Sequence, residues 1–218
     1  MTATLNGIPN SDLGTATADS IDITGNDSVE LIGDATTWTD LRVPLSATRR
    51  GSSRRPSFDK TLDNGSGSQG VFGLHFDSST EEEVYFEVQM PHEWKLGSTL
   101  KPHIHWMPSA NGSAGQKVSW GMEYSFQKIG ETFANTTIIY GDTTIPDETL
   151  VADRHYLTEL GEIDASGIDS VSAMFTCRIF RDATGAGGTD SYTSDAVLLE
   201  FDFHFEVDSF GSRTEYTK

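Results

Sequence analysis

Two histidines separated by one residue are the first candidates for chemistry in this chain. His103 and His105 stand in the segment LKPHIHWM, residues 100–107. Side chains two residues apart on a strand point to the same side. Both imidazole rings could therefore reach one ion, and neutral imidazole is a common ligand of first-row metals. The pair supports a metal-site hypothesis.

The surroundings of the pair support that hypothesis only in part. Gly97, five residues and then His-x-His resemble the opening of the cupin metal motif. The glutamate that this resemblance implies after the second histidine is missing, and so is the second cupin motif. His204 could complete a site from another strand, together with the carboxylates around it: Glu200, Asp202 and Glu206. We favour the alternative, in which His103 and His105 bond to carboxylates on a half-exposed face and no metal or other cofactor is bound.

The same carboxylates raise the possibility of acid–base chemistry. Glu200, Asp202 and Glu206 share one face of a predicted strand, and paired carboxylates act as acid and base in glycosidases. Buried like charges need cationic or hydrogen-bonding partners, and Arg178 on the preceding strand is a candidate. We favour a solvated or interface-facing edge. Cys177 lies within an apolar alternation, which indicates a core residue rather than a nucleophile.

Two further features have a structural interpretation that we prefer to a functional one. Residues 183–190, ATGAGGTD, lack the Lys-Ser/Thr of a phosphate-binding loop and predict a flexible hairpin connection. Trp94, Trp106 and Trp120 could line a sugar platform, but tryptophans in alternating strands more often fill a core. With no complete catalytic motif, we expect no enzymatic activity.

A period of two dominates the chain from residue 71 onward and predicts about eight strands. No sustained helical period appears, so we expect an all-β antiparallel sandwich, with an eight-stranded jelly roll as the favoured version. The clearest strand places Val197, Leu199, Phe201, Phe203, Phe205 and Val207 on one side. The predicted strands are 71–76, 82–90, 100–107, 117–129, 135–145, 154–163, 170–180 and 196–207.

Composition excludes several classes of protein. The 218 residues include 15 Lys and Arg against 33 Asp and Glu, a formal charge of −18. Such an acidic chain binds nucleic-acid backbone poorly and repels copies of itself unless contacts are specific. A single cysteine excludes an internal disulfide framework. No apolar run is long enough for a membrane span, and the first 30 residues do not resemble a signal peptide.

The first 37 residues differ from the rest of the chain. Residues 1–37 are rich in Thr, Ser, Asp, Asn, Gly and Ala and contain no basic residue. Their short apolar islands bury too little to offset the entropy of ordering. We therefore divide the chain into an extended N-terminal arm, 1–37, and a sandwich domain, 38–218. The arm is either a mobile terminus or a segment held by neighbouring subunits.

A cluster of basic residues follows the arm. Six of the fifteen basic residues lie between positions 42 and 60, surrounded by Ser, Gly and Pro. We predict an Arg-rich loop over residues 45–70. Its arginines could bind an acidic neighbour such as another copy of the chain, pair with the protein's own carboxylates, or contact phosphates; we favour the first and consider nucleic-acid contact the weakest. The candidate interface residues are Arg49, Arg50, Arg54 and Arg55.

Two segments resemble a group of tailed-bacteriophage virion proteins. The first is QMPHEWKLGSTLKPHIHWMPS, residues 89–109, and the second is the ending DAVLLEFDFHFEVDSFGSRTEYTK, residues 195–218. The shared pattern is MPHxWKxGS, PHxHW and a final TEYTK, and Trp38 to Arg42 resemble the start of the common region. The group is mostly of unassigned role, so the resemblance implies a structural virion component rather than a reaction.

These observations favour a non-catalytic structural subunit of a phage particle, assembled in the cytoplasm of the bacterial host. Our first choice is a capsid-associated cement or decoration protein whose partners are other copies and other virion proteins, such as the major capsid or head–tail proteins. The alternative within this class is a neck or tail ring subunit. The alternative from another class is a cupin-like metal-binding or carbohydrate-binding protein that uses the face with His103 and His105.

Overall fold

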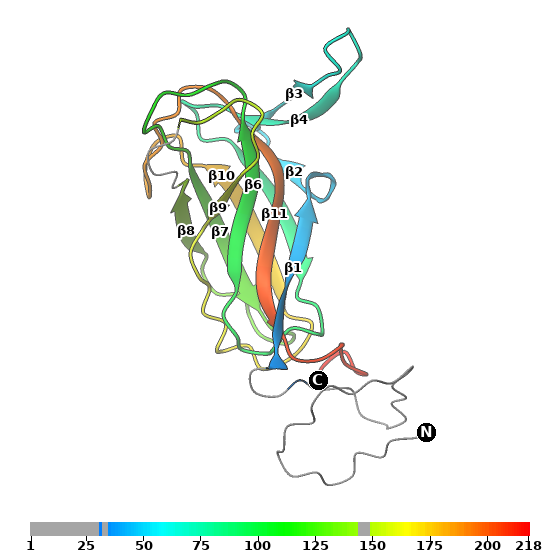
Figure 1. The fold of residues 1–218 in the computed structure, drawn as a ribbon. Coiled ribbons are helices and arrows are strands. Elements are labelled where there is room, and N and C mark those ends of the chain that lie inside the picture. The colour runs from blue at the N-terminus through cyan, green and yellow to red at the C-terminus, as the bar shows by residue number, and fades with distance from the viewer. Residues whose placement is uncertain (1–30, 32–34, 144–148) are drawn as a thin grey trace, which may run out of the picture.

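The chain folds into two antiparallel β-sheets packed face to face, as predicted (Figure 1). The structure is a computed structural model that describes residue 31, residues 35–143 and residues 149–218. Within these residues no helix is long and apolar enough to cross a membrane. The one complete helical element of the described part is a 3-10 turn, η2 (Leu45–Ala47).

Eight strands, β4 to β11, form the body of the sandwich and correspond to the eight predicted segments. One sheet contains β4, β11, β6 and β9 in that order, and the other contains β5, β10, β7 and β8. This is the strand order of a jelly roll, which two Greek keys produce. The bounds are β4 (Val71–Phe76), β5 (Glu83–Gln89), β6 (Lys101–Pro108), β7 (Ser119–Gln127), β8 (Thr137–Asp142), β9 (Tyr156–Glu159), β10 (Met174–Arg181) and β11 (Ala196–Val207).

Three further strands precede the jelly roll, and two of them correct the sequence analysis. The predicted loop over residues 45–70 contains η2, β2 (Arg49–Arg50) and β3 (Ser57–Leu62). β2 pairs with β5, and β3 forms a hairpin with β4. β1 (Thr37–Pro44) pairs along β11. Short polar strands at an edge bury little, so they lack the apolar alternation that identifies a central strand.

The predicted arm, 1–37, lies largely outside the described residues. Where the structure does describe this region, the backbone N–H of Leu31 donates to the carbonyl of Asp208. The hydroxyl of Thr36 donates to Glu206 at 2.5 Å. The end of the arm therefore follows the C-terminal end of β11 and leads directly into β1.

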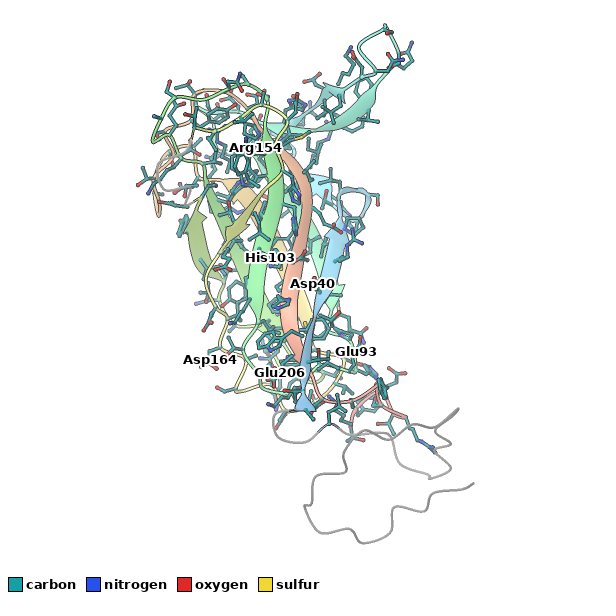
Figure 2. All side chains as sticks on the ribbon, in the orientation of Figure 1. Asp40, Glu93, His103, Arg154, Asp164 and Glu206 are labelled. Atoms are coloured by element: carbon teal, nitrogen blue, oxygen red, sulfur yellow. The ribbon has the colours of Figure 1, made fainter. Side chains whose placement is uncertain are left out.

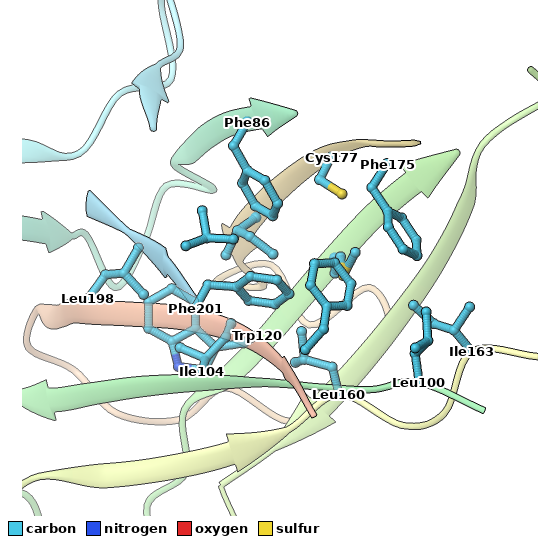
Figure 3. Packing of buried hydrophobic residues seen from close by; sticks show 14 of the residues in the cluster. Phe86, Leu100, Ile104, Trp120, Leu160, Ile163, Phe175, Cys177, Leu198 and Phe201 are labelled. Carbon is cyan, nitrogen blue, oxygen red and sulfur yellow. The ribbon is translucent and has the colours of Figure 1, made fainter. Parts of the chain in front are cut away.

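Aromatic side chains from both sheets meet in the core (Figure 3). Phe203 of β11 stacks on Phe175 of β10, with ring centroids 4.6 Å apart. A β-bulge between Leu198 and Glu200 reverses which side chains of β11 face the core on the N-terminal side of the bulge. Leu198 therefore joins Phe203 in the core, and Leu199, expected there, is only partly buried.

The glycine-rich segment 183–190 connects the two sheets, so the predicted hairpin is wrong. β10 precedes it in one sheet and β11 follows it in the other. The backbone N–H groups of Ala186, Gly187 and Gly188 donate to the carboxylate of Asp182 at 2.8–2.9 Å. This carboxylate holds the segment in a defined turn, because backbone donors and a buried acceptor satisfy each other.

The two sheets approach closely where β8 meets β9, and this contact requires a glycine. A Cβ added to Gly141 would overlap the carbonyl oxygen of Glu159. Gly141→Ala is expected to lower the free energy of unfolding by about 1–3 kcal/mol, because backbone rather than a flexible side chain must move. Gly167→Ala is the control, since its Cβ would meet nothing within 4 Å. Urea unfolding of both variants checks the prediction, and equal midpoints would contradict it.

Candidate functional site

The strand order places three polar side-chain rows next to one another on the outer face of one sheet. β11 lies between β1 and β6. In the β11–β6 register Asp202 is opposite His103, and in the β11–β1 register it is opposite Arg42. Figure 2 shows His103 midway along this sheet, close to Asp40. The core faces of the same strands are apolar, so the alternation of each strand turns these side chains outward.

Asp202 joins the two predicted histidines. Nε2 of His103 lies 2.6 Å from Oδ1 of Asp202, and Nε2 of His105 lies 3.2 Å from Oδ2. The side chain of Asp202 is only 4 % exposed. One ligand atom from each of the three residues lies within 4.8 Å of those of the other two. The structure thus brings together two imidazoles and one buried carboxylate.

The outer nitrogen of each ring also has a polar partner nearby. Nδ1 of His105 lies 2.7 Å from Nε2 of His155. Nδ1 of His103 lies 3.4 Å from the backbone carbonyl of Lys101, a long hydrogen bond. Both rings are therefore oriented with Nε2 toward Asp202 and Nδ1 toward a second group.

His204, the third predicted histidine, is not part of this group. Its Nδ1 lies 2.7 Å from a carboxylate oxygen of Asp40. The His204 ring stacks on Trp38 with a centroid distance of 5.1 Å. The ammonium group of Lys101 lies over the same Trp38 ring, 5.1 Å from its centroid. The His204 and His103 rings are 6.3 Å apart. Of the β11 residues that the sequence analysis considered for completing a site, Asp202 joins the two histidines and His204 does not.

The charge of Asp202 acts on His103. Burial of the His103 ring opposes its protonation, but contact with Asp202 and its negative charge outweigh burial, so the pKa of His103 is raised. The guanidinium of Arg42 donates to Glu200 at 2.6 and 2.8 Å and interacts with Asp202 through its charge. The carboxylate therefore remains available to the two histidines.

The carboxylates of β11 have separate partners, so they are not arranged as a pair for acid–base chemistry. Glu200 binds Arg42, and Glu206 binds Lys95 at 2.9 Å. Arg178, the predicted partner, lies in the other sheet. It pairs instead with Glu81, Glu83 and Glu123, each at 2.8–2.9 Å.

The remaining candidates for chemistry are core residues. Cys177 is buried, and burial, followed by the charge of Glu87, raises the pKa of its thiol, which disfavours a nucleophile. Trp94, Trp106 and Trp120 are each at most 1 % exposed. These three tryptophans therefore cannot form a sugar platform on the surface.

The four arginines of the candidate interface lie on the surface at β2 and the turn after it. The side chains of Arg49 and Arg54 are 79 % and 58 % exposed. Arg49 lies 3.8 Å from Glu87 and Arg54 lies 3.3 Å from Glu81. Exposed pairs of this kind contribute little to stability. Arg50 reaches the carbonyl of Pro56 at 3.4 Å, and Arg55 is exposed.

The sequence analysis missed His155 and the apolar side chains of the β3–β4 hairpin. His155 immediately precedes β9, which pairs with β6, and no local pattern connects it with His105, fifty positions earlier. The hairpin projects away from the sandwich (Figure 1). Its exposed apolar residues are Phe58, Leu62, Val71 and Phe72.

Comparisons with known proteins identify no family and find only distant structural likenesses. No family model matches the chain, and no curated protein does. The xylan-binding domain CBM22-2 of Paenibacillus barcinonensis Xyn10C is 13% identical over 74% of this chain and 92% of its own, with a TM-score of 0.37. The CBM22-1–GH10 modules of Clostridium thermocellum xylanase 10B are 14% identical over 88% of this chain but 29% of their own, with a TM-score of 0.35. A structure of infectious bursal disease virus is 11% identical over 93% of this chain and 37% of its own, with a TM-score of 0.35.

Proposed function

We propose that this protein is a non-catalytic structural subunit of a bacteriophage particle, a capsid-associated decoration protein that assembles through its Arg-rich segment and the β3–β4 hairpin. The observation that carries the proposal is an exposed apolar hairpin next to a cluster of arginines on a strongly acidic chain. The resemblance of residues 89–109 and 195–218 to virion proteins supports the same class.

The hairpin has the composition of a contact surface. Phe58 is 57 % exposed and Phe72 is 49 % exposed, and their rings lie 5.7 Å apart. Leu62 and Val71 add further exposed apolar surface toward the tip. Adjacent exposed apolar side chains indicate an interaction site, because their contact with water is unfavourable. A projecting hairpin can reach a neighbour that the body of the sandwich cannot.

Charge favours another copy of this chain, or a similarly acidic virion protein, as the neighbour. The chain carries −18 overall, yet Arg49, Arg50, Arg54 and Arg55 are consecutive in two pairs at one surface. Acidic surfaces attract such a cluster, and the attraction weakens as salt screens it. The arginines therefore supply the attraction that must offset repulsion between acidic subunits.

Replacing all four arginines by alanine is expected to weaken assembly, and raising the salt concentration of the wild-type protein is expected to do the same. The measurement is the mass distribution by sedimentation velocity at low and high salt, with and without purified capsids. A quadruple variant that assembles as well as the wild type at low salt would falsify the role of the arginines.

Matched variants separate the charge of the cluster from the net charge of the protein. Arg54→Ala/Arg55→Ala and Lys117→Ala/Lys128→Ala remove the same charge from different surfaces. We expect the first pair to reduce assembly and the second to leave it unchanged. Phe58→Ser/Phe72→Ser tests the apolar part and should reduce assembly at both salt concentrations, because apolar contact is not screened.

Stoichiometry distinguishes the two positions considered in the particle. A decoration protein binds over a lattice as monomers, dimers or trimers, whereas a neck or tail subunit forms a closed ring. Native mass spectrometry of the assembled protein reports which arrangement forms. A discrete ring of six or twelve copies would favour the neck or tail position.

A further inference from the structure

We propose that His103, His105 and Asp202 bind one divalent first-row transition-metal ion, of which Zn²⁺ is the probe of choice. The site lies on the outer face of the sheet that contains β6 and β11. Its residues are separated in sequence from the Arg-rich segment, residues 45–70. It is independent of the proposed function, since it requires no partner chain.

The three ligand positions come from two adjacent strands. His103 and His105 lie on alternate residues of β6; on β11, Asp202 lies opposite His103, two residues along from the position opposite His105. Their ligand atoms fall within 4.8 Å of one another. Metal–ligand bonds of about 2.0–2.2 Å place neighbouring ligand atoms roughly 3 Å apart, so small side-chain rotations are enough to enclose an ion.

Asp202 has a buried oxygen that lies directly against an imidazole nitrogen. Oδ1 of Asp202 is buried, and Nε2 of His103 lies 2.6 Å away at ion-pair distance but outside the alignment of a hydrogen bond. When His103 is neutral with its proton on Nδ1, this buried acceptor has no donor, which is costly. A cation between these atoms would remove that cost, because it accepts electron pairs from the oxygen and from both ring nitrogens.

The second groups around the rings suit ligation through Nε2. A neutral histidine that gives its Nε2 lone pair to a metal carries its proton on Nδ1 and usually donates it to an outer acceptor. His105 can donate to Nε2 of His155, 2.7 Å away, and His103 to the carbonyl of Lys101, 3.4 Å away. Each ring is thus held with Nε2 directed at Asp202.

The ligand set selects the class of ion. Imidazole together with carboxylate suits Zn²⁺, Fe²⁺, Ni²⁺ and Mn²⁺, whereas Ca²⁺ and Mg²⁺ prefer oxygen ligands alone. Three protein ligands leave room for water or for an oxygen atom of another molecule. The ion would also join β6 to β11, so its binding should raise the melting temperature, as any ligand specific for the folded state does.

The test uses the full chain without an affinity tag, freed of metal with a chelator. We expect about one Zn²⁺ per chain by elemental analysis after gel filtration, a rise in melting temperature, and visible absorption when Co²⁺ replaces Zn²⁺. His103→Ala/His105→Ala should abolish all three signals, and Asp202→Asn should weaken binding.

Two other histidine variants serve as controls. His204→Ala removes an imidazole from the same face and should leave the affinity unchanged, because His204 pairs with Asp40. His155→Ala should retain the stoichiometry but lose about 10–100-fold in affinity, which is typical of groups that orient a ligand. Circular dichroism establishes that each variant is folded.

Nitrogen-15 NMR of the histidine rings tests the same ligands in the wild-type protein, so this result does not depend on whether the variants fold. Zn²⁺ should shift the Nε2 resonances of His103 and His105 and leave those of His75 and His92 in place. The proposal is overturned if Zn²⁺, Co²⁺, Ni²⁺, Fe²⁺ and Mn²⁺ all fail to bind the wild-type protein stoichiometrically. It is also overturned if the double variant binds as tightly as the wild type, or if the NMR shifts fall on other histidines.

Discussion

Replacement of Arg181 by alanine is expected to lower the free energy of unfolding by about 3–5 kcal/mol, because it leaves a buried charge without its partner. Arg181 is fully buried at the end of β10. Its guanidinium forms two parallel bonds with Asp190, at 2.8 and 2.9 Å, and the Asp190 side chain is 2 % exposed. It also donates to the backbone carbonyls of Phe76, Tyr192 and Ser194.

This arginine closes one end of the sandwich. The carbonyls that it binds belong to the end of β4 and to the segment that leads into β11, while Arg181 itself ends β10 in the other sheet. Without the guanidinium, three carbonyls lose this donor together, and the carboxylate of Asp190 retains the backbone N–H of Ser119. Leaving buried acceptors unpaired costs more than the bonds contribute when they are made.

Equilibrium unfolding in urea measures this effect, with Arg49→Ala as the control. Arg49 is 79 % exposed and lies 3.8 Å from Glu87, so its replacement should change stability by less than about 0.5 kcal/mol. Arg181→Met/Asp190→Leu removes both charges but leaves the three carbonyls unpaired, so it should recover only part of the loss. A loss below about 1 kcal/mol for Arg181→Ala would show that water replaces the guanidinium.

Replacement of Phe203 by alanine is expected to cost about 3–5 kcal/mol, through lost burial and the cavity that remains. Phe203 is 0 % exposed and stacks on Phe175 of the opposite sheet at 4.6 Å. Its ring also meets the edge of Phe201 at 4.9 Å. These rings connect the two sheets, so the surrounding strands cannot close the gap without separating other contacts.

Phe72→Ala is the matched control for this prediction. Phe72 is 49 % exposed on the projecting hairpin, so its removal should change the free energy of unfolding far less than that of Phe203. Thermal and urea unfolding of both variants give the comparison. Similar losses for the two phenylalanines would mean that the sandwich core is not where stability is concentrated.

The eight strands of the jelly roll were predictable because alternation is a local property. The apolar face is clearest in β11, where Phe201, Phe203 and Phe205 alternate with polar residues. The weakest case is β9, a short mixed strand whose buried side chain is Thr158. β3 was not predictable, since Ser57–Leu62 projects from the body and has no core to face. The bulge after Leu198 could not be predicted either, because the register of β11 depends on the strands that pair with it.

For the candidate site, the sequence alone determined that His103 and His105 share a face, because side chains alternate along any strand. It also determined the acidic charge and the position of the arginine cluster. Only the tertiary structure decided that Asp202 and His155 join this pair, that His204 turns to Asp40, and that Arg178 belongs to the other sheet. The physical reason is that strand pairing joins residues far apart in the chain, and no short stretch of sequence contains the information about which strands become neighbours.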